Sequence, residues 1–248
     1  MKKLIFLLLS ILPVYLMAQT EGVIEYQETV AFEIDLPEDM KEFAAQLPSS
    51  QKVKMNLFFN EEASLYETSK NNEDPQDLQM GSEDGGMQIK MKFDRPENKV
   101  YTNIAKGKVT RKEEFMGKKF LINSKVEKTK WKLTAESEKI LGYHCQKATF
   151  QDSVRTTEVW FTPEIPISAG PQGISGLPGM VLKVVIDDGQ TVLEAINVDL
   201  KKLDKGAIKA PKKGKKVTQE EFEKIREEKM KEMEAEYGGG GNRVIIRH

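Results

Sequence analysis

The chain has 248 residues, which is enough for one large domain or two small ones. Its 38 lysines and arginines nearly balance 39 aspartates and glutamates, so the composition excludes the broad positive surface of many nucleic-acid-binding proteins. A single cysteine excludes an intrachain disulfide, and we expect Cys145 to be part of a packed core.

The first residues have the pattern of a secretory signal peptide. Lys2 and Lys3 precede an apolar run over residues 4–17, and Ala18 is a small residue where a signal peptidase would cleave. The run is shorter than the roughly 20 apolar residues of a membrane span, and no second run follows. No cysteine is near the cleavage point, so we expect no lipoprotein anchor. The sequence therefore predicts removal of residues 1–18 and export of the mature protein to the periplasm or medium.

Most of the chain up to residue 200 alternates apolar and polar residues in short segments, the pattern of half-buried strands. About twelve such segments are found, at 22–30, 53–59, 63–68, 87–93, 99–104, 109–114, 118–122, 131–133, 140–150, 154–161, 180–186 and 191–200. Many short strands with few helices predict a mostly β domain over residues 19–200. We expect a single large antiparallel sheet, shaped as a half-barrel or flattened barrel.

Two segments of the N-terminal half interrupt this pattern. Residues 37–47 begin with Pro37 and have apolar residues at helical spacing, which predicts a short helix that ends at Pro48. Residues 69–86 are polar, acidic and rich in glycine near their end, which predicts an exposed mobile loop.

The connection over residues 162–179 is unusually long for a compact domain and contains four prolines and four glycines. Its apolar residues include Ile165 and Ile167, and its prolines stiffen the backbone, which argues against disorder. Leu177-Pro178-Gly179-Met180 suits a type II turn. We predict that this segment, called the flap below, is ordered and covers the apolar face of the sheet.

The composition changes at Lys201. Residues 201–217 contain eight lysines and one acid, which predicts a basic linker. Thr218 and Glu221 form a capping box at the start of a predicted charged amphipathic helix over residues 218–237. Residues 238–248 predict a flexible tail, in which 244–246 suit an edge strand. The lysines and the eight glutamates of the helix can pair with each other, dock on the sheet or recruit a partner, and the sequence leaves these alternatives open.

Few residues suggest catalysis or metal binding. The chain has two histidines, far apart, and no Cys-x-x-Cys pair, so we expect no metal site, and no nucleotide or other cofactor motif is present. His144 and Cys145 are adjacent on a predicted strand and point to opposite faces, which excludes a catalytic dyad. Glu158 and Glu164 flank Trp160 near the flap and are the weak candidates for a general acid and base.

Four aromatic residues lie close to the flap in the sequence: Trp131, Tyr143, Trp160 and Phe161. They are candidates to line an apolar ligand cavity under it. Core packing would account for the same residues without a ligand, and this alternative also stays open.

The segment Gly176-Leu177-Pro178-Gly179-Met180-Val181 resembles the signature of the GLPGLI family of exported Bacteroidota proteins. The blocks at 131–149 and 158–171 are similar to blocks that precede the signature in that family. This resemblance implies a β-rich envelope protein without an established activity, and it supplies no catalytic residues. The signature residues Gly176, Leu177, Pro178 and Gly179 fit the predicted turn that pins the flap, so we expect their role to be structural.

The sequence thus favours a non-enzymatic envelope protein that binds an apolar small molecule or another envelope protein. One alternative is a hydrolase with a carboxylate site under the flap. A second alternative is a scaffold whose C-terminal helix docks a partner.

Overall fold

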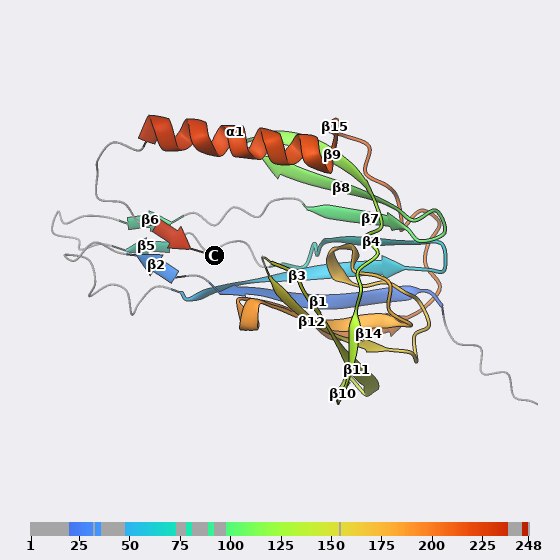
Figure 1. Cartoon of the computed structure of the whole chain (residues 1–248). Coiled ribbons are helices and arrows are strands. Elements are labelled where there is room, and N and C mark those ends of the chain that lie inside the picture. The colour runs from blue at the N-terminus through green and yellow to red at the C-terminus, as the bar shows by residue number, and fades with distance from the viewer. Residues whose placement is uncertain are drawn as a thin grey trace, which may run out of the picture.

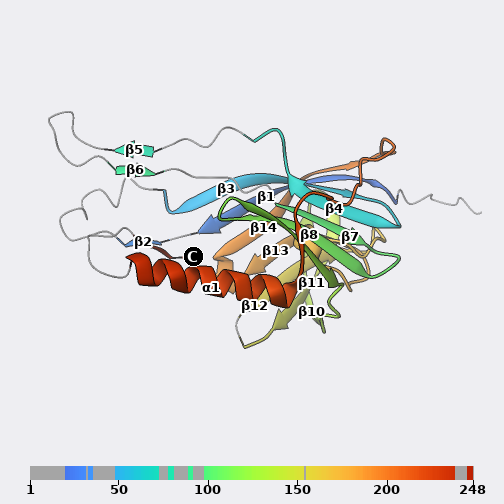
Figure 2. The same ribbon diagram turned by 90° about the horizontal axis from the view of Figure 1, so that it is seen from above.

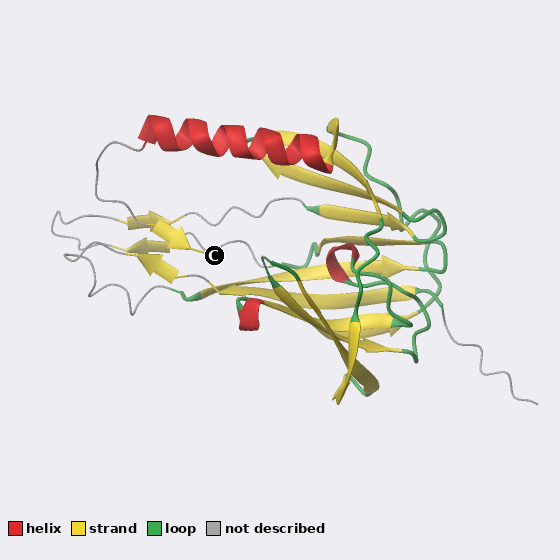
Figure 3. Cartoon of the chain, in the orientation of Figure 1, coloured by secondary structure: helices red, strands yellow, loops and turns green. Residues whose placement is uncertain are grey.

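The computed structural model describes residues 20–31, 33–35, 48–72, 78–80, 89–91, 98–153, 155–237 and 245–247. Within them the chain is mostly β, with one large sheet and one α-helix (Figures 1 and 3). The twelve strands of the sheet, in spatial order, are β10 (Lys132–Ile140), β11 (Tyr143–Gln151), β12 (Thr156–Thr162), β13 (Met180–Ile186), β14 (Thr191–Leu200), β1 (Gly22–Ala31), β3 (Ser50–Phe59), β4 (Ala63–Thr68), β7 (Lys99–Asn103), β8 (Lys108–Phe115), β9 (Lys118–Lys125) and β15 (Lys215–Thr218).

This arrangement confirms the predicted mostly β fold with one large sheet. All neighbouring strands are antiparallel except β15, which pairs with β9 in parallel, so the sheet is mixed rather than purely antiparallel. Strands β10 and β15 are its two edges, and the sheet is not closed into a barrel. Two small antiparallel pairs lie outside it: β2 (Glu33–Asp35) with β16 (Ile245–Arg247), and β5 (Leu78–Met80) with β6 (Ile89–Met91).

The predicted strand over residues 140–150 is wrong at its start. Strand β10 continues to Ile140, and β11 begins only at Tyr143. Between them Leu141 and Gly142 both have positive φ, 49° and 93°, the backbone of a tight hairpin turn whose twist matches the flanking strands. Because leucine rarely adopts this conformation, the sequence around Gly142 did not predict the turn.

Other boundaries also differ from the prediction. The predicted loop over residues 69–86 contains β5, and Ser69 at its start is buried. The predicted linker over 201–217 ends in β15, because Lys215, Lys216 and Val217 pair with β9. The signal segment 1–18, the helix at 37–47 and residues 238–244 of the tail lie outside the described residues.

The main hydrophobic core lies between one face of the sheet and the flap. Register partners share a face, and the row Ile24, Leu57, Tyr66 and Val100 extends across β1, β3, β4 and β7 with every side chain buried. We call this the inner face and the opposite one the outer face. The flap supplies the apolar cover that an open sheet of this size needs on one side.

The flap packs its apolar residues inward, as their pattern predicts. Ile165, Ile167 and Leu177 are buried in the main core. The backbone N–H of Met180 donates to the carbonyl of Ile165 at 3.0 Å, and that of Val181 donates to the carbonyl of Ala169 at 2.9 Å, so the start of β13 hydrogen-bonds to the first half of the flap. A short 3₁₀ turn, Pro171–Gly173, lies over β4 and β7.

The corner at Leu177–Met180 is a bend and not the type II turn that the sequence predicts. Gly179 has φ of +155°, far from the roughly +80° of the third position of such a turn. A Cβ atom at Gly179 would lie 2.1 Å from the carbonyl oxygen of Thr162. Glycine is therefore required here because two backbone segments touch.

The helix α1 (Gln219–Tyr237) packs on the inner face at the far edge of the sheet, beside β9 and β15 (Figures 1 and 2). Phe222 is buried against Phe120, at 5.2 Å between ring centroids, and against Ile122. The predicted capping box is present, since the Glu221 N–H donates to Thr218 Oγ1 at 3.1 Å and the Thr218 N–H donates to Glu221 Oε2 at 2.8 Å. Among the described residues no helix has the length and apolar character needed to cross a membrane.

Candidate functional site

The most structured group of polar and aromatic side chains surrounds Trp160 on the outer face. Trp160 is in the middle of β12, where its register partners are Lys147 on β11 and Lys183 on β13. The two ammonium nitrogens lie 5.2 Å and 4.9 Å from the centre of the indole ring, within the range of cation–π attraction. The neighbours Val159 and Phe161 are buried in the core, as alternation along a strand requires.

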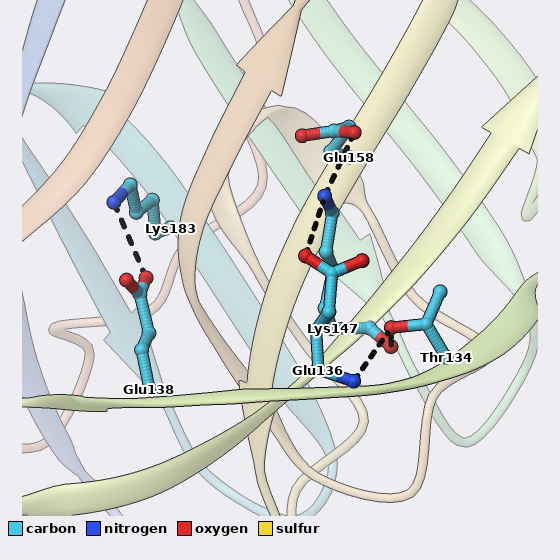
Figure 4. Close-up of polar contacts among 6 residues, drawn as sticks. All are labelled: Thr134, Glu136, Glu138, Lys147, Glu158 and Lys183. Carbon is cyan, nitrogen blue, oxygen red and sulfur yellow. Dashed lines mark hydrogen bonds and ion pairs between the residues drawn. The ribbon is translucent and has the colours of Figure 1, made fainter.

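Four carboxylates surround the two lysines. Lys147 Nζ lies 2.9 Å from Glu158 and 3.2 Å from Glu136, and Lys183 Nζ lies 3.2 Å from Glu138 (Figure 4). Glu194 on β14 is 4.0 Å from Lys183. We call this group the Trp160 face; it consists of Glu136, Glu138, Lys147, Glu158, Trp160, Lys183 and Glu194. Its carboxylates outnumber its ammonium groups, so its formal charge is negative.

A local irregularity in β10 positions Glu136 next to Lys147. The register between β10 and β11 shifts between Leu133 and Ser137. Thr134 fills the gap: its hydroxyl donates to the Lys147 carbonyl at 3.2 Å and accepts the Glu136 N–H at 3.2 Å (Figure 4). Glu136 is thereby held beside Lys147 with its side chain 66% exposed.

The electrostatics of Lys147 follow from these contacts. The hydrogen bond with Glu158 is the main cause that raises the pKa of Lys147 above its ordinary value, and Glu136 adds to it. Only 12% of the Lys147 side chain is exposed, because the indole ring and the carboxylates cover it. The Lys147 ammonium group therefore stays charged at neutral pH. Glu136 and Glu194 present carboxylate oxygens to solvent.

The structure does not bring the two candidate catalytic carboxylates together. Glu158 pairs with Lys147 on the outer face, whereas Glu164 accepts the backbone N–H of His144 at 2.8 Å. Each has its own partner, and they form no acid–base pair. His144 is exposed, whereas Cys145 is buried, and burial raises the pKa of the Cys145 thiol to about 11.

The four candidate ligand-binding aromatics are also separated. Phe161 is 2% exposed and part of the core. Trp131 is half-buried and donates from Nε1 to the carbonyl of Ser175 at 3.0 Å, so it supports the flap near Gly176. Tyr143 is half-buried at the start of β11, and desolvation, with Glu164, raises its pKa. Among the described residues, Trp160 is the one aromatic of the four that has lysine ammonium groups over its ring.

Sequence reasoning missed a second polar group, which lies on the inner face. Glu28 on β1 accepts hydrogen bonds from the hydroxyl of Tyr66 at 3.2 Å and from the amide of Gln172 in the flap at 3.5 Å. The pKa of Glu28 is raised above its ordinary value, because desolvation outweighs the two hydrogen bonds, which act to lower it. The sequence contained the information to find this group: Glu28 lies two and four residues after Tyr26 and Ile24 on one strand, so its side chain faces the core as theirs do.

Metal ligation finds no support in the part of the chain that the structure describes. There, no three histidine, cysteine, aspartate or glutamate residues are grouped so that they could hold an ion.

Comparison with known proteins places this chain in a family. Residues 81–223, more than half of the chain, match the family described as "N-glycanase peptide, N-terminal domain". The chain belongs to this family. All residues of the Trp160 face lie inside the matched segment. No curated protein matches the chain.

Two solved structures are similar to this N-glycanase N-terminal domain family member, and the first of them supports a shared fold. One is PNGF-II in a P21 crystal form, with 20% sequence identity and a TM-score of 0.52 over 83% of this chain and 33% of PNGF-II. PNGF-II in a C2 crystal form is 19% identical with a TM-score of 0.49, over 81% of this chain and 32% of PNGF-II. The present chain therefore spans about a third of the length of PNGF-II, and the likeness concerns the fold alone.

Proposed function

We propose that this chain is a non-enzymatic glycan-binding domain and that the Trp160 face is its binding surface. The observation that carries the proposal is a half-buried tryptophan on the outer face of a sheet, among charged groups with free hydrogen-bonding capacity. Membership of an N-glycanase domain family supports a carbohydrate as the ligand.

The chemistry of the Trp160 face suits a sugar ring. A pyranose has an apolar face of C–H groups and a rim of hydroxyls. An indole ring offers apolar area at a low cost in conformational entropy, and carboxylates accept hydrogen bonds from hydroxyls while ammonium groups donate to them. Lys147 and Lys183 already hold the ring and the carboxylates in place, so little ordering is needed on binding.

Binding is favoured over the hydrolase alternative because of the placement of the carboxylates. Glycoside hydrolysis uses two carboxylates that flank one bond. Glu158 and Glu164 instead engage Lys147 and the His144 backbone. The structure of PNGF-II is of a longer protein, and the activity of that protein is not part of this proposal.

Export of the chain is part of the same proposal. The charged and apolar N-terminal segment and the resemblance to the GLPGLI family support it, and glycans are abundant outside the cytoplasm. An envelope protein as an additional partner stays a prediction.

The proposal is tested with immobilised N-glycans released from glycoproteins. We expect the wild-type protein to bind a subset of them, and Trp160→Ala to weaken that binding at least about tenfold, a loss typical of a central aromatic contact. Tyr101→Ala, which removes a half-buried aromatic from β7, is the matched control and is expected to bind normally. Unchanged binding by a folded Trp160→Ala protein, or no binding by the wild type, would refute the proposal.

A further inference from the structure

A strip of lysines is the second surface of this domain with a distinct chemical character. The segment from Lys201 to Lys216, called the Lys strap below, connects β14 to the edge of the sheet at β15. All eight of its lysines are exposed, and its single acid is Asp204. Within the described residues only Lys201 forms an ion pair, with Asp199 on β14.

More lysines lie at the end of the sheet where the Lys strap begins. Leu200 is the register partner of Gly22, which places Lys201 at the end of β1 and β14. The same end contains the β7–β8 turn with Lys106 and the paired residues Lys108 and Lys125, all exposed. Lys128 and Lys130 follow in the exposed connection to β10. Figure 1 shows the strap and these turns together at one end of the molecule.

The Lys strap is elongated because of its position in the topology. It joins strands that are separated in the sheet by β1, β3, β4, β7, β8 and β9. At about 4.8 Å between neighbouring strands, this corresponds to a distance on the order of 30 Å. The lysines are therefore spread along a strip and not collected around one point.

The backbone of the strap is held in place. The Leu203 N–H donates to Glu21 at 3.3 Å, and the Ala207 N–H donates to the Asp204 carbonyl at 3.0 Å. Leu203, Ala207 and Ile208 are half-buried. The lysines are therefore attached to a backbone that is already ordered, which lowers the conformational entropy lost when a ligand binds.

Among the described residues, the glutamates of α1 form no direct ion pair with the lysines of the strap. None of the ion pairs among the described residues joins a lysine of the strap to a glutamate of the helix; Lys229 of α1 pairs with Glu232 of the same helix. The sequence-based alternative in which linker and helix pair with each other therefore finds no support in these contacts.

We propose that the Lys strap binds an acidic polysaccharide, a linear polymer carrying uronate or sulfate groups. A linear polyanion matches a row of lysines on the order of 30 Å long. The strap has no aromatic residue on which nucleic-acid bases could stack, and its larger apolar side chains, Leu203 and Ile208, are half-buried and not exposed for insertion into a bilayer. This site is separate from the Trp160 face and goes beyond the glycan binding proposed for it.

The experiment measures binding to heparin and to polygalacturonate as a function of salt. The strap variant replaces Lys202, Lys205, Lys209 and Lys212 with glutamine. The matched control replaces four other exposed lysines, Lys52, Lys139, Lys224 and Lys231, with glutamine, so both variants lose the same charge.

We expect the wild type to bind one or both polymers and the strap variant to bind at least tenfold more weakly at 0.1 M salt. The slope of log Kd against log salt is expected to fall by about one for each lysine that contacts the polymer. The control variant and Trp160→Ala are expected to bind like the wild type, which separates this site from the Trp160 face.

Three results would overturn the proposal. The first is equal loss of binding in the strap and control variants, which would indicate a general charge effect. The second is the absence of binding to either polymer by the wild type. The third is tighter, strap-dependent binding to vesicles of phosphatidylglycerol than to either polymer, which would assign the strip to a lipid surface.

Discussion

The buried hydroxyl of Tyr26 donates a 2.6 Å hydrogen bond to the backbone carbonyl of Val181, 155 residues further along the chain. Strands β1 and β13 are not neighbours, so this bond reaches across β14. The N–H of the same Val181 donates to Ala169 in the flap at 2.9 Å. Val181 thus connects the centre of the sheet with the flap, directly after the Leu-Pro-Gly corner.

Tyr26→Phe is expected to destabilise the protein by about 1–3 kcal/mol, because the Val181 carbonyl would lose its side-chain donor inside the core. Urea denaturation measures the change. Tyr143→Phe is the control, since the Tyr143 hydroxyl makes no hydrogen bond with the residues that the structure describes, and it is expected to be near neutral. Equal effects of the two substitutions would contradict the role of the Tyr26 hydroxyl.

Gly179→Ala is expected to destabilise the fold by more than about 3 kcal/mol or to prevent folding, since its Cβ would lie 2.1 Å from the Thr162 carbonyl oxygen. Gly107→Ala is the matched control: Gly107 also has positive φ, +59°, but a Cβ there meets nothing within 4 Å. Gly107→Ala should lower the free energy of unfolding by only about 1–2 kcal/mol, because only the left-handed backbone conformation is unfavourable for alanine there. Chemical denaturation of both variants decides whether the close contact at Gly179 matters.

The change in unfolding free energy caused by Glu28→Gln is expected to be more favourable at pH 7 than at pH 4. Burial raises the pKa of Glu28, so the folded state favours the protonated carboxyl. The associated stability is fully present below the ordinary pKa of 4.5 and is lost as the pH rises through the raised value. Glutamine is neutral at both pH values and avoids that loss. Urea denaturation at the two pH values tests this, and a pH-independent difference would contradict it.

Phe222→Ala is expected to release α1 from the sheet while the main core stays folded. Phe222 contacts Phe120, Ile122 and Val217 in a cluster separate from the main core, and truncating a buried phenylalanine costs about 3–5 kcal/mol. Amide exchange should accelerate in α1 and β15 and remain slow in β12–β14. Met233→Ala, at a position that is 43% exposed, is the control and should leave exchange unchanged.

Processing of the N-terminus is expected to remove residues 1–18. Protein recovered from the envelope or medium of an exporting cell should begin at Gln19, as shown by intact mass and N-terminal sequencing. Leu8→Arg places a charge inside the apolar run and should leave the precursor uncleaved. A wild-type product that retains Met1 would contradict the prediction.

Local patterns account for the parts of the fold that the sequence predicted. Alternation along segments such as 22–30 identified strands, and the capping box at Thr218 located the start of the helix. Local geometry also separates Trp160 from Phe161, since neighbouring strand residues point to opposite faces. The turn at Leu141–Gly142 escaped prediction because leucine rarely adopts positive φ.

The sequence by itself determined where most of the strands lie, which residues along a strand share a face, and that an apolar segment stiffened by prolines would cover the sheet. Only the tertiary structure decided that β14 lies beside β1, that β15 adds to β9 in parallel, and that Lys147 and Lys183 meet over Trp160. The reason is physical: alternation depends on neighbours along the chain, whereas strand order and the partners of a side chain depend on contacts between residues far apart in the sequence.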